Sequence, residues 1–233
     1  ALDRIGMKHI RGITLDLDDT LWDIWSVIRR AEVELHRHIE LHYPKVASRY
    51  DADGLRSLRN QVHETRPDLA HDLTELRRYS FAMILEECDY DPAGSHDLMD
   101  RFLALRHDVE LYPDVLPALE ALEGRYPIVA LSNGNANINR LAISKFFSGQ
   151  VSAADAGVKK PDAKIFALGC EALDLEPASV LHVGDHPVED VIGALDAGLT
   201  AVWVNRSAGV WEQQQKPSAQ VTSMLGLVEL LAR

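Results

Sequence analysis

The sequence predicts an α/β protein with a doubly wound, Rossmann-like parallel sheet that is interrupted after its first strand by an all-helical segment. Apolar runs of strand length occur near the start of the chain and again from residue 127, where they alternate with helix-length segments, as in a parallel sheet. Residues from about 22 to 110 show only helical spacing, over a length too great for an ordinary crossover between strands. We therefore expect one α/β core domain, residues 1–21 and 111–233, and one inserted helical domain, residues 22–110.

The composition is that of an ordinary globular protein, with 46% hydrophobic and 26% charged residues among 233. The 36 acidic against 24 basic residues give a net charge of −12, which argues against a nucleic-acid partner, because that binding needs Lys and Arg to neutralise phosphates. A small phosphorylated substrate is compatible with this charge. Cys88 and Cys170 lie far apart and outside any metal-ligand spacing, so we expect reduced thiols. No apolar run has transmembrane length and no signal peptide opens the chain, so we expect a cytoplasmic protein without a membrane partner. For the oligomeric state, which the sequence does not determine, the expectation is a monomer or a homodimer.

The first predicted strand covers residues 13–17, and three acidic residues, Asp16, Asp18 and Asp19, mark its end. Because side chains repeat every two residues along a strand, Asp16 and Asp18 should leave it on the same side, and Thr20 continues the series. Two carboxylates this close repel each other unless a cation neutralises them. The stretch therefore favours a divalent metal site with a carboxylate nucleophile and a carboxylate acid/base. The alternative at this point is an Asp-rich turn after a strand.

Four helices are predicted in the inserted segment, from apolar residues at helical spacing and from capping residues at the helix starts. Pro44 and Pro67 are expected to end the first two of them. In order, the helices are expected from residue 23 to about 39, from 51 to 63, from 72 to about 84 and from 95 to 105.

From residue 112 onward, strands and helices alternate. Strands are expected over residues 127–132, 150–152, 180–183 and 200–204. Helices are expected over residues 114–123, 137–145, 161–173, 188–197 and 223–231, and a polar loop over 207–218. The order of the strands within the sheet does not follow from the sequence.

Polar clusters follow several of these strands. They are residues 132–135 (SNGN), residues 158–161 (VKKP) at a helix start, and residues 184–187 (GDHP) with Asp190 shortly after. Taken singly, each has a local explanation as a turn, a helix start or a cap. In open parallel sheets, however, ligands bind beyond the carboxyl ends of the strands. The convergence of these clusters at one edge therefore favours an active site.

In order along the chain, the segments LDLDDTL, LSNG, KKPD and VGD with a later Asp resemble the four motifs of the haloacid dehalogenase-like hydrolase superfamily. The inserted helical segment resembles the cap that this family carries between its first two motifs. The resemblance implies that Asp16 is the nucleophile and takes the phosphoryl group as an aspartyl phosphate. It implies that Asp18 protonates the leaving oxygen and then activates water, that Ser132 hydrogen-bonds the phosphoryl oxygens, and that Lys160 steadies the charge of these groups.

The cofactor that this resemblance implies is Mg²⁺. Its ligands would be Asp16, the backbone carbonyl of Asp18, and Asp185, with Asp190 as a nearby acid or a ligand through water. Oxygen ligands suit Mg²⁺ rather than zinc, and no Cys/His set in the sequence competes with them. A metal and a lysine would supply the charge neutralisation that phosphoryl transfer needs.

Asp18 favours phosphate chemistry within the superfamily. Its dehalogenases are similar to this chain in fold and nucleophile but carry an aromatic residue where Asp18 stands, since releasing a halide needs no proton donor. The segments HDLT (71–74), SNGN (132–135) and LHVGD (181–185) extend the resemblance to bacterial phosphatases of flavin mononucleotide and of the phosphorylated pyrimidine intermediate of riboflavin synthesis. The alternatives are a pyrimidine nucleotidase or a sugar-phosphate phosphatase and, further away, a haloacid dehalogenase, a phosphomutase or a non-catalytic binding protein.

Five residues are expected to bind the substrate: Asn133 and Gly134 from the second motif, and Trp22, Arg77 and Arg78 from the helical segment. Trp22 lies near a helix start and could stack on a flat ring, with core packing as the alternative. Arg77 and Arg78 point in different directions on a helix, so at most one faces the substrate, and a solvated helix face is the alternative.

Overall fold

The computed structural model describes residues 7–232 and confirms the doubly wound α/β fold. The chain divides into two compact units, one with the described residues up to Asp23 and from Leu111 onward, the other formed by Ile24–Glu110. The first unit contains the sheet, and the second is helical. Among residues 7–232, no helix is both long and apolar enough to cross a membrane.

The sheet has six parallel strands in the described part of the chain, in the order β3-β2-β1-β4-β5-β6. Their bounds are β1 Gly12–Leu15, β2 Ile128–Ser132, β3 Gly149–Ser152, β4 Val180–Gly184, β5 Thr200–Val204 and β6 Ala219–Val221. The central strands β1, β2 and β4 are buried along their whole length, as expected for a parallel sheet covered on both faces. Because the strands are parallel, the carboxyl ends of β1, β2 and β4 meet at one edge.

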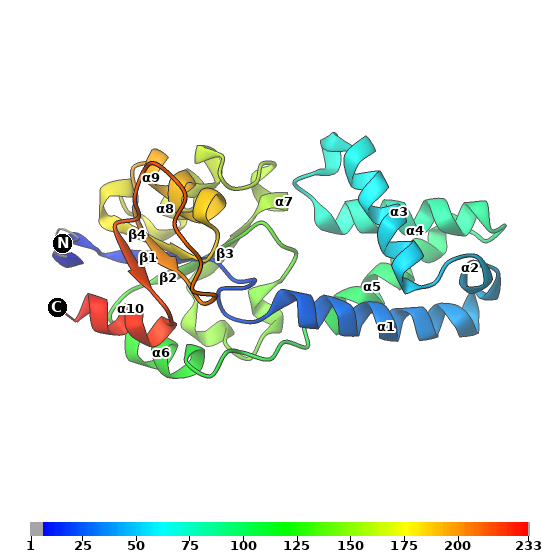
Figure 1. Ribbon diagram of the computed structural model, residues 1–233, viewed down its shortest axis with the longest axis horizontal. Coiled ribbons are helices and arrows are strands. Elements are labelled where there is room, and N and C mark those ends of the chain that lie inside the picture. Colours follow the sequence, from blue (N-terminus) through cyan, green and yellow to red (C-terminus); the bar gives the residue numbers. More distant parts are fainter. Residues whose placement is uncertain (1–6, 233) are drawn as a thin grey trace. The chain divides into compact units, whose positions relative to one another are not determined.

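Helices cover both faces of this sheet. Helices α6 (Val115–Leu122) and α10 (Met224–Leu231) lie on one face, and α8 (Ala163–Leu173) and α9 (Gly193–Asp196) lie on the other (Figure 1). The short α7 (Ala153–Ala156) follows β3 directly. Gly169 allows α8 to approach the sheet, since a Cβ at this position would lie 3.0 Å from Cγ2 of Thr14 in β1.

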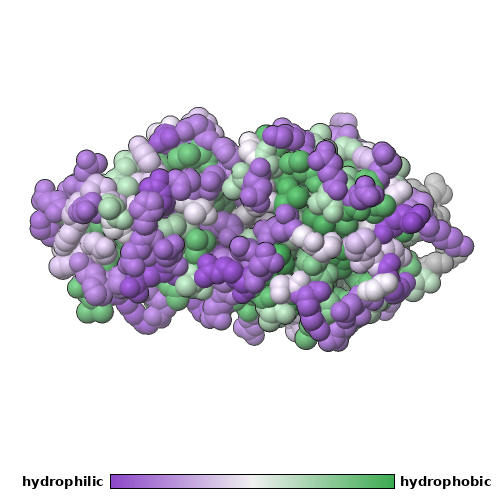
Figure 2. Space-filling model, turned by 180° about the vertical axis from the view of Figure 1, so that it is seen from behind, coloured by the Kyte–Doolittle hydropathy of each residue, from purple (hydrophilic) through white to green (hydrophobic). Residues whose placement is uncertain are grey.

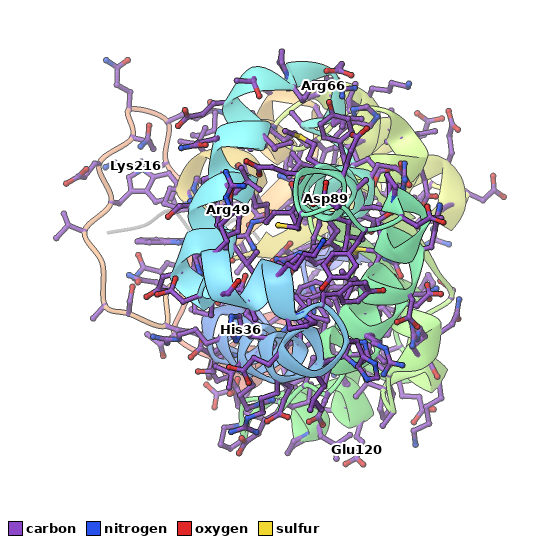
Figure 3. The ribbon with its side chains drawn as sticks, turned by 90° about the vertical axis from the view of Figure 1, so that its right-hand side faces the viewer. His36, Arg49, Arg66, Asp89, Glu120 and Lys216 are labelled. Carbon is purple, nitrogen blue, oxygen red and sulfur yellow. The ribbon has the colours of Figure 1, made fainter. Side chains whose placement is uncertain are left out.

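The helical unit has its own hydrophobic core. Its helices are α1 (Ile24–His42), α2 (Pro44–Arg49), α3 (Ala52–Thr65), α4 (Leu73–Glu87) and α5 (Ser95–Arg106). Leu35, Phe81 and Phe102, from α1, α4 and α5, lie in the same buried cluster. Ion pairs on the surface connect α2 to the end of α4, from Arg49 to Glu87 (2.5 Å) and from Lys45 to Asp89 (3.3 Å); Arg49 and Asp89 are labelled in Figure 3. The face of this unit seen in Figure 2 is largely hydrophilic.

Several local expectations need correction. The first helix does end before Pro44, at His42, but the short helix α2 that follows was not expected; Pro44 occupies its first turn, where a missing N–H is tolerated. Residues 137–145 contain two 3₁₀ turns instead of a helix, and residues 188–197 begin with a π-helical turn, Pro187–Ile192, before α9. The short edge strand β6 was not expected. β1 ends at Leu15, so Asp16 is the first residue beyond the strand.

Candidate active site

Asp16 lies at the centre of the sheet edge, directly after β1. Its backbone N–H donates to the carbonyl of Val183 in β4 (2.9 Å), and the residue is only 6% exposed. Carboxylate oxygen Oδ1 accepts a hydrogen bond from Nζ of Lys160 (2.6 Å), and Oδ2 accepts one from the hydroxyl of Thr20 (2.8 Å). Both oxygens are therefore oriented, which is what an attacking carboxylate requires.

Lys160 connects the acids of this edge. Its Nζ is buried and donates to Asp16 and to Oδ1 of Asp190, both at 2.6 Å. Asn133 holds the lysine backbone, since its Oδ1 accepts the Lys160 N–H (2.7 Å) and its amide donates to the Lys160 carbonyl (3.1 Å). Burial acts to lower the pKa of Lys160, but the two carboxylates outweigh it and raise that pKa above its ordinary value. The side chain is therefore a fixed positive charge.

Three carboxylates converge beside this lysine. Oxygens of Asp16, Asp185 and Asp190 lie within 4.8 Å of one another. The hydroxyl of Thr20 donates to Oδ1 of Asp185 (3.2 Å) as well as to Asp16, so it links these two acids. With one lysine against three carboxylates, negative charge is in excess. Because the donors are hard oxygens, the residues present fit a divalent cation such as Mg²⁺.

The carboxylate of Asp190 is occupied by donors from the protein. It accepts hydrogen bonds from Lys160, from Nε2 of His182 (3.1 Å) and from the backbone N–H of His186 (2.9 Å). Since Nε2 of His182 donates to a carboxylate, its Nδ1 is the acceptor for the hydroxyl of Thr14 (2.9 Å). Asp190 thus orients Lys160. Asp16 and Asp185 accept fewer hydrogen bonds from the protein than Asp190 does, so their oxygens are better able to bind a cation.

The buried charges shift one another's protonation. Burial raises the pKa of Asp16 above its ordinary value, and Lys160 opposes this only in part. Burial and the charge of Asp190 raise the pKa of Asp185 to about 7. Burial also acts to raise the pKa of Asp190, but the charge of Lys160 and the hydrogen bond from His182 hold it well below the ordinary range. A bound divalent cation would favour the ionised forms of Asp16 and Asp185.

Asp18 lies in a tight turn that also contains Trp22. Asp19 has a φ of 61°, and its N–H donates to the carbonyl of Trp22 (2.8 Å). The indole N–H of Trp22 donates to Oδ1 of Asp18 (2.9 Å), and Trp22 is completely buried. The buried ring and the contact of its polar atom with the predicted acid/base favour the alternative of core packing for Trp22, and stacking on a substrate ring stays a prediction.

The second motif lies at the end of β2, the strand that pairs with β1. Ser132 is 1% exposed, and its Oγ accepts the N–H of Gly134 (3.0 Å), which leaves the hydroxyl proton for another acceptor. The amide of Asn133 donates to Oε2 of Glu189 (2.9 Å) in addition to its two bonds with Lys160. Substrate binding by Ser132 and Gly134 stays a prediction. The side chain of Asn133 has a different use, which is to hold the lysine.

Arg77 and Arg78 lie on α4 of the helical unit, and both guanidinium groups have acidic partners there. Arg77 contacts Glu32 (3.4 Å) and lies 3.6 Å above the centre of the Phe102 ring. Burial, together with a neighbouring arginine, lowers the pKa of Arg77 to about 9. Arg78 pairs with Glu75 (2.6 Å) one turn earlier on the same helix. Neither contact supports the substrate-binding prediction, which remains untested.

Four contacts of the site were not predicted. Asp16 accepts from the hydroxyl of Thr20, and Asp190 accepts from the ring of His182. The amide of Asn133 donates to the carboxylate of Glu189, and the indole of Trp203 donates to the carbonyl of Asp185 (2.7 Å). Thr20 had a signal in its place two residues beyond Asp18. The other three act across the fold and have no local signature.

Comparison with known proteins identifies relatives along nearly the whole chain. A family model described as haloacid dehalogenase-like hydrolase matches residues 10–198. The chain is 30% identical over 233 residues to 5-amino-6-(5-phospho-D-ribitylamino)uracil phosphatase YigB of Escherichia coli strain K12, with 97% of this chain and 98% of that protein covered. It is also 29% identical to an (S)-2-haloacid dehalogenase of Pseudomonas sp. strain YL, with 96% and 95% covered.

Comparison with solved structures also identifies a similar protein along nearly the whole chain. The crystal structure of a 2-haloacid dehalogenase from Pseudomonas syringae pv. Tomato DC3000 superimposes with a TM-score of 0.88 at 33% identity, covering 96% of this chain and 99% of that one. Phosphatases and dehalogenases are thus both similar to this chain at comparable identity. The overall likeness does not separate the two activities, and the residues of the site must do so.

Proposed function

The chain belongs to the haloacid dehalogenase-like hydrolase family, and from this membership and its site we propose that it is a Mg²⁺-dependent phosphatase of a small phosphorylated metabolite. The observation that carries the proposal is Asp18. It is a second carboxylate beside the predicted nucleophile Asp16, oriented by the indole of Trp22. Releasing an alkoxide requires a proton donor, whereas releasing a halide does not. A carboxylate at this position therefore supports phosphate ester hydrolysis.

The proposed reaction has two steps. In the first, a carboxylate oxygen of Asp16 attacks phosphorus, the bond from phosphorus to the leaving oxygen breaks, and the proton of Asp18 passes to that oxygen. In the second, Asp18 takes a proton from water while the water oxygen attacks phosphorus, and the bond to Asp16 breaks to release inorganic phosphate. Lys160 stays charged throughout and offsets the negative charge beside Asp16.

Asp16, Asp185 and the backbone carbonyl of Asp18 would hold Mg²⁺, which when bound neutralises charge on the phosphoryl oxygens. The support for this assignment is the convergence of the carboxylates of Asp16 and Asp185 on one point, with Thr20 donating to both. We further propose that the helical unit, Ile24–Glu110, is a cap domain that supplies substrate specificity.

For the substrate, we propose flavin mononucleotide or the phosphorylated ribitylaminouracil of riboflavin synthesis. The support is the similarity over nearly the full length to a phosphatase whose name gives that uracil derivative as substrate. Other similar phosphatases are named for phosphoserine and for N-acylneuraminate 9-phosphate, at 27% and 28% identity. A substrate panel should therefore contain phosphoserine and a sugar phosphate, together with a pyrimidine nucleotide, which the sequence leaves open as an alternative.

Dehalogenation is the second candidate, because a haloacid dehalogenase has the solved structure with 33% identity and a TM-score of 0.88. The two activities are separated by measuring phosphate release from the metabolite panel and halide release from 2-chloropropionate, with Mg²⁺ and with excess chelator. We expect Mg²⁺-dependent phosphate release and no halide release. Halide release that persists in chelator would overturn the proposal.

Rapid-quench labelling then tests the roles of the two acids. With an aryl phosphate, whose leaving group departs without protonation, Asp18→Asn should accumulate labelled phosphoenzyme, whereas Asp16→Asn should form none. With an alkyl phosphate, Asp18→Asn should be slow already in the first step, by about 10²- to 10⁴-fold. Asp196→Asn, at an exposed position on α9, is the matched control and should keep full turnover. Label on the Asp16→Asn protein at this strand end would contradict the assignment.

A further inference from the structure

Trp22 is the buried residue whose polar atom contacts the proposed acid/base. Its Nε1 lies 2.9 Å from Oδ1 of Asp18, and none of its surface is exposed. An indole has a single polar hydrogen and accepts no hydrogen bond, so the N–H of Trp22 is the donor and the carboxyl oxygen is the acceptor. The contact therefore has a defined direction, from Trp22 to Asp18.

The backbone around Trp22 leaves the indole little freedom. Residues 18 and 22 pair as an isolated β-bridge, and the Trp22 carbonyl accepts the N–H of Asp19. On its other side, Trp22 pairs with Leu111, and the N–H of Tyr112 donates to the carbonyl of Leu21 (2.9 Å). The backbone from which the indole extends is thus held on one side by residues 18–19 and on the other by residues 111–112, which are distant from them in sequence.

We propose that Trp22 is a positioning residue for the acid/base chemistry of Asp18, an inference that rests on the proposed function. By donating to Oδ1, the indole makes Oδ1 the carbonyl-like oxygen, so that Oδ2 carries the proton that passes to the leaving oxygen. As the bond from phosphorus to that oxygen breaks, the Oδ2–H bond breaks too, and Asp18 remains as a carboxylate that still accepts from Trp22. The same fixed carboxylate then takes the proton of water through Oδ2.

The competing explanation is that Trp22 only fills the core. In that case its loss would destabilise the protein or slow every substrate equally. A positioning role has a different signature, because proton donation matters for an alkoxide leaving group and not for a nitrophenolate. The informative quantity is the ratio of kcat/KM for an aryl phosphate to kcat/KM for an alkyl phosphate, which we term the leaving-group ratio.

The test compares Trp22→Phe, Asp18→Asn and the double variant. Phenylalanine keeps an aromatic side chain but lacks the N–H, so Trp22→Phe should raise the leaving-group ratio about tenfold, a part of the 10²- to 10⁴-fold contribution of acid/base catalysis. In the Asp18→Asn background the same substitution should leave the ratio unchanged, because the group that it positions is gone. Trp211→Phe, which removes an indole hydrogen bond to the carbonyl of Gln215 on an exposed loop, should leave the ratio at the parent value.

If Trp22→Phe does not fold, a benzothiophene analogue of tryptophan at position 22 replaces only the N–H by sulfur and is measured in its place. A leaving-group ratio that stays at the parent value in a folded protein, or that changes by the same factor with and without Asp18, would overturn the inference. If Asp18→Asn itself does not change the ratio, the proposed function has failed instead, so the two failures are distinguishable.

Discussion

Replacing Lys160 by methionine tests how the charges of the site are balanced. Nζ of Lys160 makes two hydrogen bonds of 2.6 Å in a buried position, to Asp16 and to Asp190. Methionine keeps much of the volume but leaves three clustered carboxylates without this cation. Breaking a buried ion pair from one side typically costs about 3 to 5 kcal/mol, because an uncompensated charge remains. We expect a loss of this size in the free energy of unfolding at pH 8 with chelator present.

The loss should depend on pH with a defined sign. In the parent protein, Lys160 and His182 hold the pKa of Asp190 below its ordinary value, so Asp190 contributes stability at neutral pH that is lost only as the pH falls through that lowered pKa. Without the lysine, burial raises the pKa of Asp190, so the variant regains stability when the carboxylate is protonated. The difference between parent and variant should therefore be largest at pH 8 and smaller at pH 5.

Urea unfolding followed by tryptophan fluorescence at the two pH values measures this difference. Lys159→Met is the matched control, since Lys159 is the preceding residue and is exposed, and it should change the free energy of unfolding by less than about 0.5 kcal/mol. Combining Lys160→Met with Asp190→Asn should recover part of the loss by removing one buried charge. A loss below about 1 kcal/mol at pH 8, or an equal loss at pH 5 and pH 8, would refute this reasoning.

Three further predictions follow from the same contacts. Because Asp185 has a pKa of about 7 and must be ionised to bind a cation, the rise in melting temperature caused by Mg²⁺ should be larger at pH 8 than at pH 6 in a thermal-shift assay; an equal rise would contradict this ligand assignment. Thr20→Val removes the hydroxyl that donates to Asp16 and Asp185, and it should lower kcat about tenfold or more in a folded protein. Thr20→Ser, which keeps the hydroxyl, should restore activity. Normal turnover by the valine variant would show that the hydroxyl is dispensable. Glu32→Gln leaves the three arginines around this buried carboxylate without their shared charged partner, so it should reduce the free energy of unfolding of the helical unit by about 2 kcal/mol at pH 7. Glu34→Gln, at an exposed position, should not reduce it. Equal effects of the two substitutions would contradict a special role for Glu32.

The α/β fold could be predicted because its evidence is local. Each strand of the sheet centre is a short apolar run, and the helical unit shows helical spacing along most of its length. The errors have local causes too. Pro44 ends one helix but also suits the first turn of the next, which spacing alone does not reveal. β6 has three residues and no buried apolar run, so its existence depends on pairing with β5.

The candidate site was predictable to a different degree. Asp16, Ser132 and Asp185 each lie at or just beyond a strand end, and parallel topology is sufficient to bring strand ends together. The partners that orient them depend on distances between residues far apart in sequence. The hydrogen bond from His182 to Asp190 requires β4 and the π-helical turn after it to be in place. The complete burial of Trp22 did not follow from the sequence, because the burial of an aromatic residue near a helix start depends on which segments pair around it.

The charges of the site also bear on why phosphoryl transfer here would need a metal ion. Three carboxylates face one lysine, so negative charge is in excess before any substrate arrives. A phosphate monoester adds further negative charge beside Asp16, and attack by a carboxylate on such a group is opposed by repulsion. Lys160 cannot offset this alone, since both of its buried hydrogen bonds already go to acids of the site. A divalent cation at Asp16 and Asp185 would supply the missing positive charge at the point where it is needed, and it would also keep Asp185 ionised. The same acids that repel one another therefore make the cluster, with a divalent cation bound, suited to binding a phosphate ester.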